Sequence, residues 1–96
     1  MANICDNTFY AYSKDKSNLN TIIEFVKTLE DVDITCDDES VSAYFSSNWC
    51  FPEDDMNNLF ESIPNKQDIY MRCLSVEYGC LYHALWICDE YGWKEV

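Results

Sequence analysis

Six cysteines and one histidine are the side chains of this sequence best suited to metal chemistry. The cysteines stand at positions 5, 36, 50, 73, 80 and 88. Structural zinc sites are usually built from two close ligand pairs, but the chain has no C-x-x-C pair and no second histidine beside His83. Cysteine is also among the most buried residue types. We therefore expect buried, reduced thiols and no metal or other cofactor.

Nucleophilic chemistry would have to combine a cysteine with His83. A reactive thiolate needs a cationic or helix N-terminal setting that lowers its pKa, and only Cys50, just before an expected helix, has one. His83 alternates with Leu81, Leu85 and Ile87, which is typical of a structural histidine. The sequence thus favours a protein that is not an enzyme, with a thiol enzyme or metal protein as an alternative.

The densest group of functional side chains is acidic. It falls within ten residues and consists of Glu30, Asp31, Asp33, Asp37, Asp38 and Glu39. A calcium loop of the EF-hand type needs a central glycine and oxygen ligands at alternating positions, which this segment lacks. The acids either protect the edge of a sheet from aggregation or form a docking patch for Lys and Arg of a partner.

A second acidic group, Glu53-Asp54-Asp55, occupies the first turn of an expected helix. Acidic side chains there complement the helix dipole by roughly 0.3–1 kcal/mol each. They therefore need no partner to explain them, although they can extend an acidic surface.

Charge restricts the partners further. The chain carries 18 acidic and 6 basic residues, for a formal net charge of −12. A field of this sign repels nucleic acid and anionic membranes and attracts basic surfaces, of which the commonest belong to nucleic-acid-binding proteins. The start of the chain does not resemble a secretory signal, and no apolar run approaches the roughly 20 residues of a membrane span. We expect a soluble, cytoplasmic protein.

Hydrophobic periodicity predicts the elements that must position these residues. The 96 residues form one domain, 1–96, with 48% hydrophobic composition. The expected strands cover 3–13, 32–36, 40–47, 68–77 and 81–88, and the expected helices cover about 18–30, with Ser17 as N-cap, and from Pro52 to Ile63. This order predicts an α+β, ferredoxin-like split β-α-β fold with a C-terminal hairpin strand. Two helices would cover one face of an antiparallel sheet, and the second strand would lie at its edge.

Aromatic side chains are expected on the uncovered face of that sheet. Alternation places Tyr10, Tyr12 and Tyr44 there, and Tyr82 and Trp86 could join them. Such a face can stack bases, but binding of nucleic acid also requires basic residues along the phosphate path, and six are too few. A protein partner or a homodimer fits an aromatic face ringed by acid better.

Three short motifs stand near the start, in the middle and near the end of the chain: Asn3-Ile4-Cys5-Asp6-Asn7, Ser46-Ser47-Asn48-Trp49-Cys50-Phe51-Pro52 and Glu77-Tyr78-Gly79. They resemble the YubB-type ferredoxin-like family of phage- and plasmid-encoded proteins of unknown function. The chain departs from the family at Ile4, where tryptophan is frequent, and lacks the longer insertions of many members. The resemblance implies an origin in a mobile element and a bacterial host cell, and it implies no established chemistry.

From the charge and this resemblance we expect a small acidic inhibitor from a phage or other mobile element. Its carboxylates would stand in for phosphates on a basic host protein, for which a CRISPR-associated or other defence nuclease is the expected class. The expected contacts are the six acids from Glu30 to Glu39 and the three tyrosines. The alternative is a homo-oligomeric accessory protein that buries its aromatic face against a second copy.

Overall fold

Strand alternation organises the chain around β1 (Ile4–Tyr12), whose odd-numbered residues from Cys5 to Ala11 are buried. The computed structural model describes residues 3–79 and 81–96. It contains one six-stranded sheet in the order β2-β3-β1-β4-β5-β6, with every neighbouring pair antiparallel. The other strands are β2 (Glu30–Cys36), β3 (Ser40–Asn48), β4 (Tyr70–Glu77), β5 (Tyr82–Asp89) and β6 (Gly92–Glu95).

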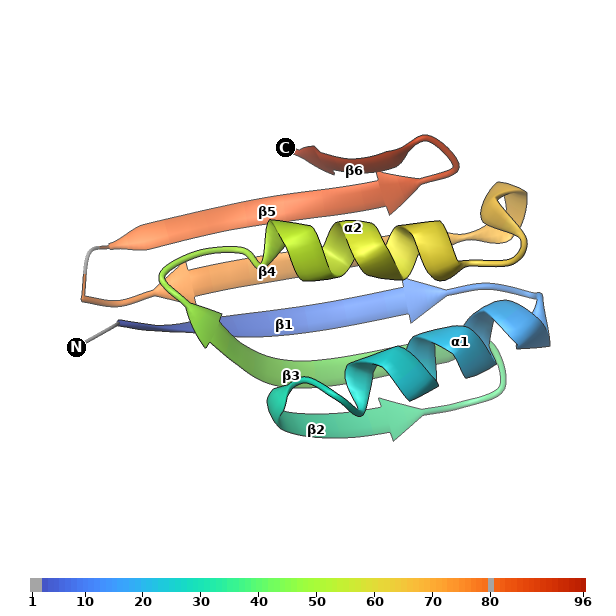
Figure 1. Ribbon diagram of the computed structural model, residues 1–96, viewed down its shortest axis with the longest axis horizontal. Coiled ribbons are helices and arrows are strands. Elements are labelled where there is room, and N and C mark those ends of the chain that lie inside the picture. The colour runs from blue at the N-terminus through green and yellow to red at the C-terminus, as the bar shows by residue number, and fades with distance from the viewer. Residues whose placement is uncertain (1–2, 80) are drawn as a thin grey trace.

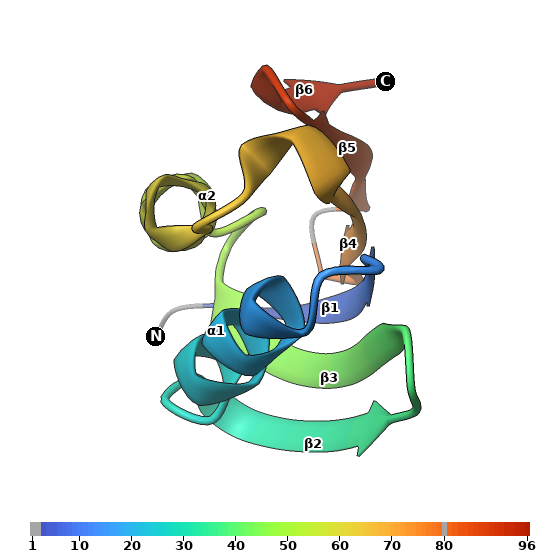
Figure 2. The same ribbon diagram turned by 90° about the vertical axis from the view of Figure 1, so that its right-hand side faces the viewer.

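Two helices connect these strands on one side of the sheet. Helix α1 (Lys16–Val26) leads from β1 to β2, and α2 (Glu53–Ser62) leads from β3 toward β4 through the short 3₁₀ helix η1 (Lys66–Asp68). Both helices lie in front of the sheet in Figure 1 and on the same side of it in Figure 2. The expected α+β class, with two helices over an antiparallel sheet, is confirmed, as is the edge position of β2.

The start and end of α1 differ from the expectation. Asp15, and not Ser17, is the N-cap residue, because its Oδ1 accepts a hydrogen bond of 2.9 Å from the Ser17 N–H. The helix therefore begins at Lys16 and ends at Val26, four residues earlier than expected. The N–H groups of Thr28 and Leu29 turn to the carbonyls of Phe25 and Val26, which closes the helix and starts β2 at Glu30.

The C-terminal residues form an element to which the sequence analysis assigns nothing. Strand β6 pairs with β5 after a turn in which Gly92 has a φ of 107°, a value that favours glycine. Its Trp93 reaches α2, where Nε1–H donates to the Met56 carbonyl at 2.9 Å. Strand β6 is thus the edge strand at the end of the sheet opposite β2, and Trp93 joins it to α2.

The hydrophobic core lies between the helices and the sheet. The apolar stripes of α1 and α2 contribute the buried residues Leu19, Ile22, Val26, Met56 and Leu59.

Tyr82 and Trp86 of β5 also belong to the covered side, so the expectation that they join the open aromatic face is wrong. The Trp86 ring stacks on Phe51 with centroids 4.4 Å apart, and the Tyr82 hydroxyl accepts a bond of 3.4 Å from the Phe51 N–H. Docking of the segment before α2 therefore decides which side of β5 is buried.

A buried polar residue, Asn7, connects the three central strands. Its Nδ2 donates to the Ser47 hydroxyl at 2.9 Å and to the Phe45 carbonyl at 3.3 Å, both on β3. Its Oδ1 accepts from the Ser75 hydroxyl on β4 at 2.6 Å. Because a buried amide is costly unless it is hydrogen-bonded, these bonds hold β1 in register with both neighbours.

None of the helices in the described part of the chain is long and apolar enough to cross a membrane.

Candidate protein-binding surface

The six acids from Glu30 to Glu39, here called the acidic edge, lie on β2 and on the turn that follows it. All six are exposed. Strand β2 is the outermost strand on this side, and a bulge between Glu30 and Asp33 puts Asp31 at a φ of 52°. Local structure thus turns a short run of sequence into a continuous negative border of the sheet.

Within this edge, Asp37 has a structural duty. Its Oδ1 accepts hydrogen bonds from the N–H groups of Glu39 and Ser40 and from the Ser40 hydroxyl, at 3.0, 2.9 and 2.9 Å. These bonds, with that of the Glu39 N–H first, lower the pKa of Asp37 below its ordinary value. Lys16 donates to the Asp38 carbonyl on the same turn. Asp37 therefore holds the turn and stays ionised, while the carboxylates around it remain available.

The uncovered side of the sheet, here called the open face, carries the three expected tyrosines. Tyr44 is 61% exposed and Tyr12 is 36% exposed, while Tyr10 is half-buried. The strand register places Tyr44, Thr8, Leu74 and Leu85 in one row across four strands. Leu74 and Leu85 are exposed apolar residues that the sequence analysis missed. Together with their neighbours, they line a shallow hollow of about 370 Å³.

Arg72, the only arginine of the chain, lies in the middle of the open face. Its guanidinium carbon is 4.3 Å from the centroid of the Tyr10 ring and 5.9 Å from that of Tyr70. A cation this close to a ring is attracted by the negative face of its π-system. Tyr10 is thus already engaged by Arg72, which leaves Tyr12 and Tyr44 as the more available aromatic groups.

Tertiary pairing joins the acidic edge to two of the tyrosines. Asp33 lies directly opposite Tyr44 in the β2–β3 register. The Tyr12 hydroxyl donates to Glu39 Oε2 at 3.2 Å, and the charge of Glu39 raises the pKa of Tyr12. Asp31 and Tyr44 also line one hollow together with Asp6. The edge and these tyrosines form a single surface, and Tyr10, beside Arg72, lines the same hollow of the open face as Tyr44.

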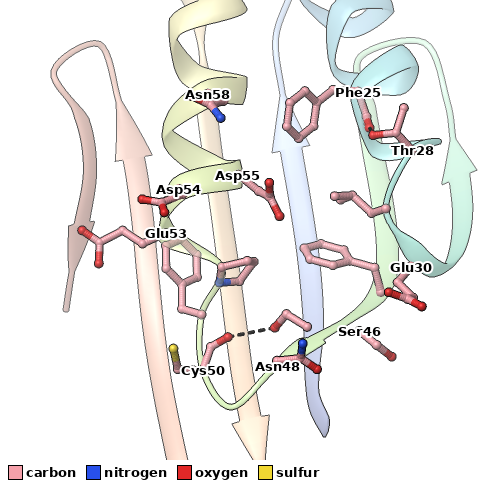
Figure 3. Close-up of a pocket in the computed structure, with 15 residues that line it drawn as sticks. Phe25, Thr28, Glu30, Ser46, Asn48, Cys50, Glu53, Asp54, Asp55 and Asn58 are labelled. Atoms are coloured by element: carbon pink, nitrogen blue, oxygen red, sulfur yellow. Dashed lines mark hydrogen bonds between the residues drawn. The ribbon is translucent and has the colours of Figure 1, made fainter. Parts of the chain in front are cut away.

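The second acidic group of the sequence, Glu53-Asp54-Asp55, lines a cavity beside the acidic edge. This cavity of about 670 Å³ opens between the end of α1, the end of β3 and the start of α2, and its lining includes Glu30, Glu53, Asp54 and Asp55. In Figure 3, Asp55 extends from α2 toward α1, while Glu53 and Asp54 extend to the other side of the helix. Glu30 belongs both to this cavity and to the acidic edge. The two acidic groups of the sequence are therefore neighbours in space.

The acids are also concentrated along the sequence. Residues 28–65 contain no Lys, Arg or His and ten acids, namely Glu30, Asp31, Asp33, Asp37, Asp38, Glu39, Glu53, Asp54, Asp55 and Glu61. The five lysines and Arg72 all lie outside this segment. A one-sided distribution of this kind raises the local negative potential beyond what the net charge alone conveys.

The thiols are only partly as expected. Cys5, Cys73 and Cys88 are buried, but Cys36 and Cys50 are exposed, so the expectation of buried thiols is wrong for these two. All five are free, and Cys80 lies outside the described residues. Burial raises the pKa values of Cys73 and Cys88 to about 12, and it also raises that of Cys5. The three buried thiols therefore stay protonated, which is the opposite of what nucleophilic chemistry needs.

His83 does not meet a cysteine partner. It is exposed and lies opposite Val76 on the open face. Cys50 lines the cavity on the helix side of the sheet, so the sheet separates the two side chains. Across residues 3–79 and 81–96, no three His, Cys, Asp or Glu residues gather where they could hold a metal ion.

Comparison with known proteins gives no relative from which a function could be transferred. No protein-family model, no curated protein and no solved structure matches the chain. The features of this chain that bear on its function are therefore the acidic edge, the open face and the cavity.

Proposed function

We propose that this protein acts by binding, and that it blocks the cationic surface of a nucleic-acid-binding protein. The carboxylates of the acidic edge take the place of phosphates, and the neighbouring aromatic groups of the open face supply apolar anchors. The single observation that carries the proposal is that the acidic edge and the open face are continuous. Six exposed acids border a face on which Asp33 lies opposite Tyr44 and the Tyr12 hydroxyl donates a hydrogen bond to Glu39.

The proposed mechanism is competition. A partner surface that binds nucleic acid presents Lys and Arg at the spacing of phosphates, and it releases counterions when it binds any dense array of negative charge. Association of such surfaces is steered by their fields and weakens with salt, because the screening length is only about 8 Å at physiological ionic strength. The exposed Tyr44 beside the charges, and Leu74 two strands farther along the same row, would then be desolvated, which slows dissociation.

For the target, we propose a defence nuclease of a bacterial host, with a CRISPR effector as the foremost case. This step rests on the resemblance of three short motifs to YubB-type proteins of mobile elements and on the charge. We also propose that β1 to β4 with α1 and α2 form a ferredoxin-like split β-α-β unit. The order β2-β3-β1-β4 supports it, because each helix connects two strands that have one other strand between them.

A matched pair of charge variants tests the proposal. The edge variant carries Asp31→Asn, Asp33→Asn and Asp38→Asn, and it leaves Asp37 in place to hold the turn. The control variant carries Glu61→Gln, Glu90→Gln and Glu95→Gln, which are also exposed but lie outside the acidic edge. Both remove three charges from the net charge of −12, so only the location differs.

The assay measures displacement of labelled DNA from a panel of RNA-guided nucleases at 50 and 300 mM salt. We expect competition at the lower salt concentration and a loss of about tenfold in the edge variant, since each exposed ion pair contributes roughly 0.2–1 kcal/mol. The control variant should retain its potency. Equal loss in both variants would show that net charge, and not the edge, is responsible. Absence of competition across the panel would contradict the proposed target class.

A homo-oligomeric accessory role is the second candidate, and one observation favours it. Tyr44, Leu74 and Leu85 expose apolar area side by side on the open face, as at the interfaces of homodimers. Sedimentation of the protein at 150 mM salt distinguishes the two roles. A stable dimer that dissociates on Leu74→Lys would favour self-association, whereas a monomer would leave the open face for another partner.

A further inference from the structure

The outer edge of β2 carries backbone groups that no other strand uses. In the β2–β3 hairpin the Asp37 N–H donates to the Ser40 carbonyl at 3.0 Å, which sets the alternation of the ladder. With this register, Thr35 and Asp33 bond to β3, while the N–H and C=O groups of Ile34 and Cys36 point away from the sheet. Within the described part of the chain no further strand pairs with these outward groups, and β2 ends the sheet in Figure 1.

The edge is also regular enough to accept another strand. The bulge of β2 is confined to the stretch between Glu30 and Asp33, and pairing with β3 is uninterrupted from Asp33 to Cys36. Ile34 packs against the core, which keeps this part of the strand in place. Exposed strands are often protected by Pro or Lys, and residues 30–39 contain neither. Acidic side chains are therefore the only protection of this stretch.

The negative charge of these side chains determines which kind of strand can pair with the edge. A second copy of the chain would bring an identical row of carboxylates against the first, and like charges placed opposite each other on paired strands are destabilising. A strand rich in Lys or Arg would instead place positive charges beside Asp33, and again beside Asp37 and Asp38 beyond the end of β2. Charge thus opposes self-pairing and favours a cationic extended segment.

We propose that the edge of β2 binds an extended Lys- and Arg-rich segment of the partner protein as a seventh strand. This inference rests on the proposed function and adds the mode of binding: main-chain bonds to Ile34 and Cys36 provide affinity, and alternate side chains provide specificity. A cationic side chain placed beside Asp33 on the open face lies next in line to Tyr44, whose ring is 61% exposed. Long cationic side chains gain there from both the carboxylate and the ring.

Two substitutions at Cys36 isolate the backbone contribution. Cys36→Pro removes one outward N–H, and the ladder to β3 does not use that group. Cys36→Val changes the same exposed side chain but keeps the N–H. Neither variant alters a carboxylate, so electrostatic attraction is the same in both. Circular dichroism and thermal unfolding of both variants serve as the control for folding.

The probe is a fluorescein-labelled ten-residue peptide that alternates Lys with Thr, followed by fluorescence anisotropy at 50 mM salt. We expect Cys36→Pro to weaken binding about tenfold relative to Cys36→Val, as for the loss of one net hydrogen bond. Equal peptide affinity of the two variants would overturn the proposal that the partner segment binds as a seventh strand, while the proposed charge-based function would stand. Conversely, loss in Cys36→Pro with no effect of Asp33→Asn would support the strand and contradict the charge-based function.

Amide hydrogen exchange of the unmodified protein gives a measurement that does not depend on the folding of a variant. Saturating peptide should slow exchange at Ile34 and Cys36 at least about tenfold and leave the other edge strand, β6, unchanged. A control peptide that alternates Glu with Thr should protect neither strand. Unchanged exchange at Ile34 and Cys36 under saturating Lys-Thr peptide would overturn the proposal.

Discussion

Replacing Asn7 by aspartate puts a carboxylate at the centre of the sheet without changing the shape of the side chain. Asn7 is 1% exposed. Its Nδ2 faces three oxygens: Ser47 Oγ at 2.9 Å and the carbonyls of Phe45 and Cys5 at 3.3 and 3.5 Å. The Ser47 hydroxyl proton is already donated to the Cys50 carbonyl at 2.8 Å. An aspartate would therefore turn an acceptor toward three acceptors. Its other oxygen would keep the Ser75 hydroxyl as a donor at 2.6 Å and the weakly donating thiols of Cys5 and Cys73 at 3.9 Å.

The expected loss of stability follows from this geometry. A buried charge that lacks compensation destabilises a protein by about 3–5 kcal/mol, so we expect a loss near 3 kcal/mol at pH 7. Burial and the opposed carbonyls raise the folded-state pKa of the new carboxyl above its unfolded value of about 3.9. The variant is therefore closest to the parent below about pH 4. Between the two pKa values the deficit grows by about 1.4 kcal/mol per pH unit.

The assay is urea unfolding followed by circular dichroism at pH 4, 5, 6 and 7, with the parent measured at each pH. Asn20→Asp is the matched control, because Asn20 is exposed on α1 and the same charge is added there. We expect the control to stay within about 0.5 kcal/mol of the parent at every pH. A deficit of the Asn7→Asp variant that is below about 1 kcal/mol at pH 7, or that does not change with pH, would refute the reasoning.

Three further predictions concern the core, a turn and the thiols. Phe51→Ala should reduce the unfolding free energy by about 3 kcal/mol, because this 3% exposed ring stacks on a tryptophan of β5; a loss below about 1 kcal/mol in urea unfolding would contradict this. Gly92→Ala should reduce it by about 1–2 kcal/mol through its φ of 107°, and an unchanged melting temperature would argue against strain there. At pH 8, iodoacetamide followed by peptide mass mapping should modify Cys36 and Cys50 in the folded protein and Cys73, with a pKa of about 12, only after unfolding. Equal rates at these three positions would contradict the assigned burial.

Local patterns in the sequence identified most of the secondary structure. The alternation of β1 predicted a strand over 3–13, and the strand covers Ile4–Tyr12. The prediction was possible because alternation of buried and exposed side chains depends only on residues that are neighbours in the chain. The N-cap of α1 was misassigned for an equally local reason. Asp15 and Ser17 are both good cap residues, and Ser17 donates its N–H and its hydroxyl to Asp15, so the earlier residue takes the position.

Local patterns do not predict which side of β5 is buried. This strand is apolar on both sides, so periodicity cannot say which side is buried. The choice is made by Phe51, which comes far before Trp86 in the chain and stacks on it at an interplanar angle of 5°. The same contact directs Leu85 and His83 to the open face. The candidate surface therefore includes Leu85, which no local pattern could assign.

By itself, the sequence determined the charge, the alternation of the strands and the exposure of the acids, because these depend on composition and on residues close together in the chain. Only the tertiary structure decided which of these groups meet. The β2–β3 register puts Asp33 beside Tyr44, the β1–β4 register puts Arg72 over Tyr10, and packing of α2 brings Asp55 to the same cavity as Glu30. Each of these meetings is set by long-range strand pairing and core packing, which minimise the energy of the whole chain and leave no signature in any single segment.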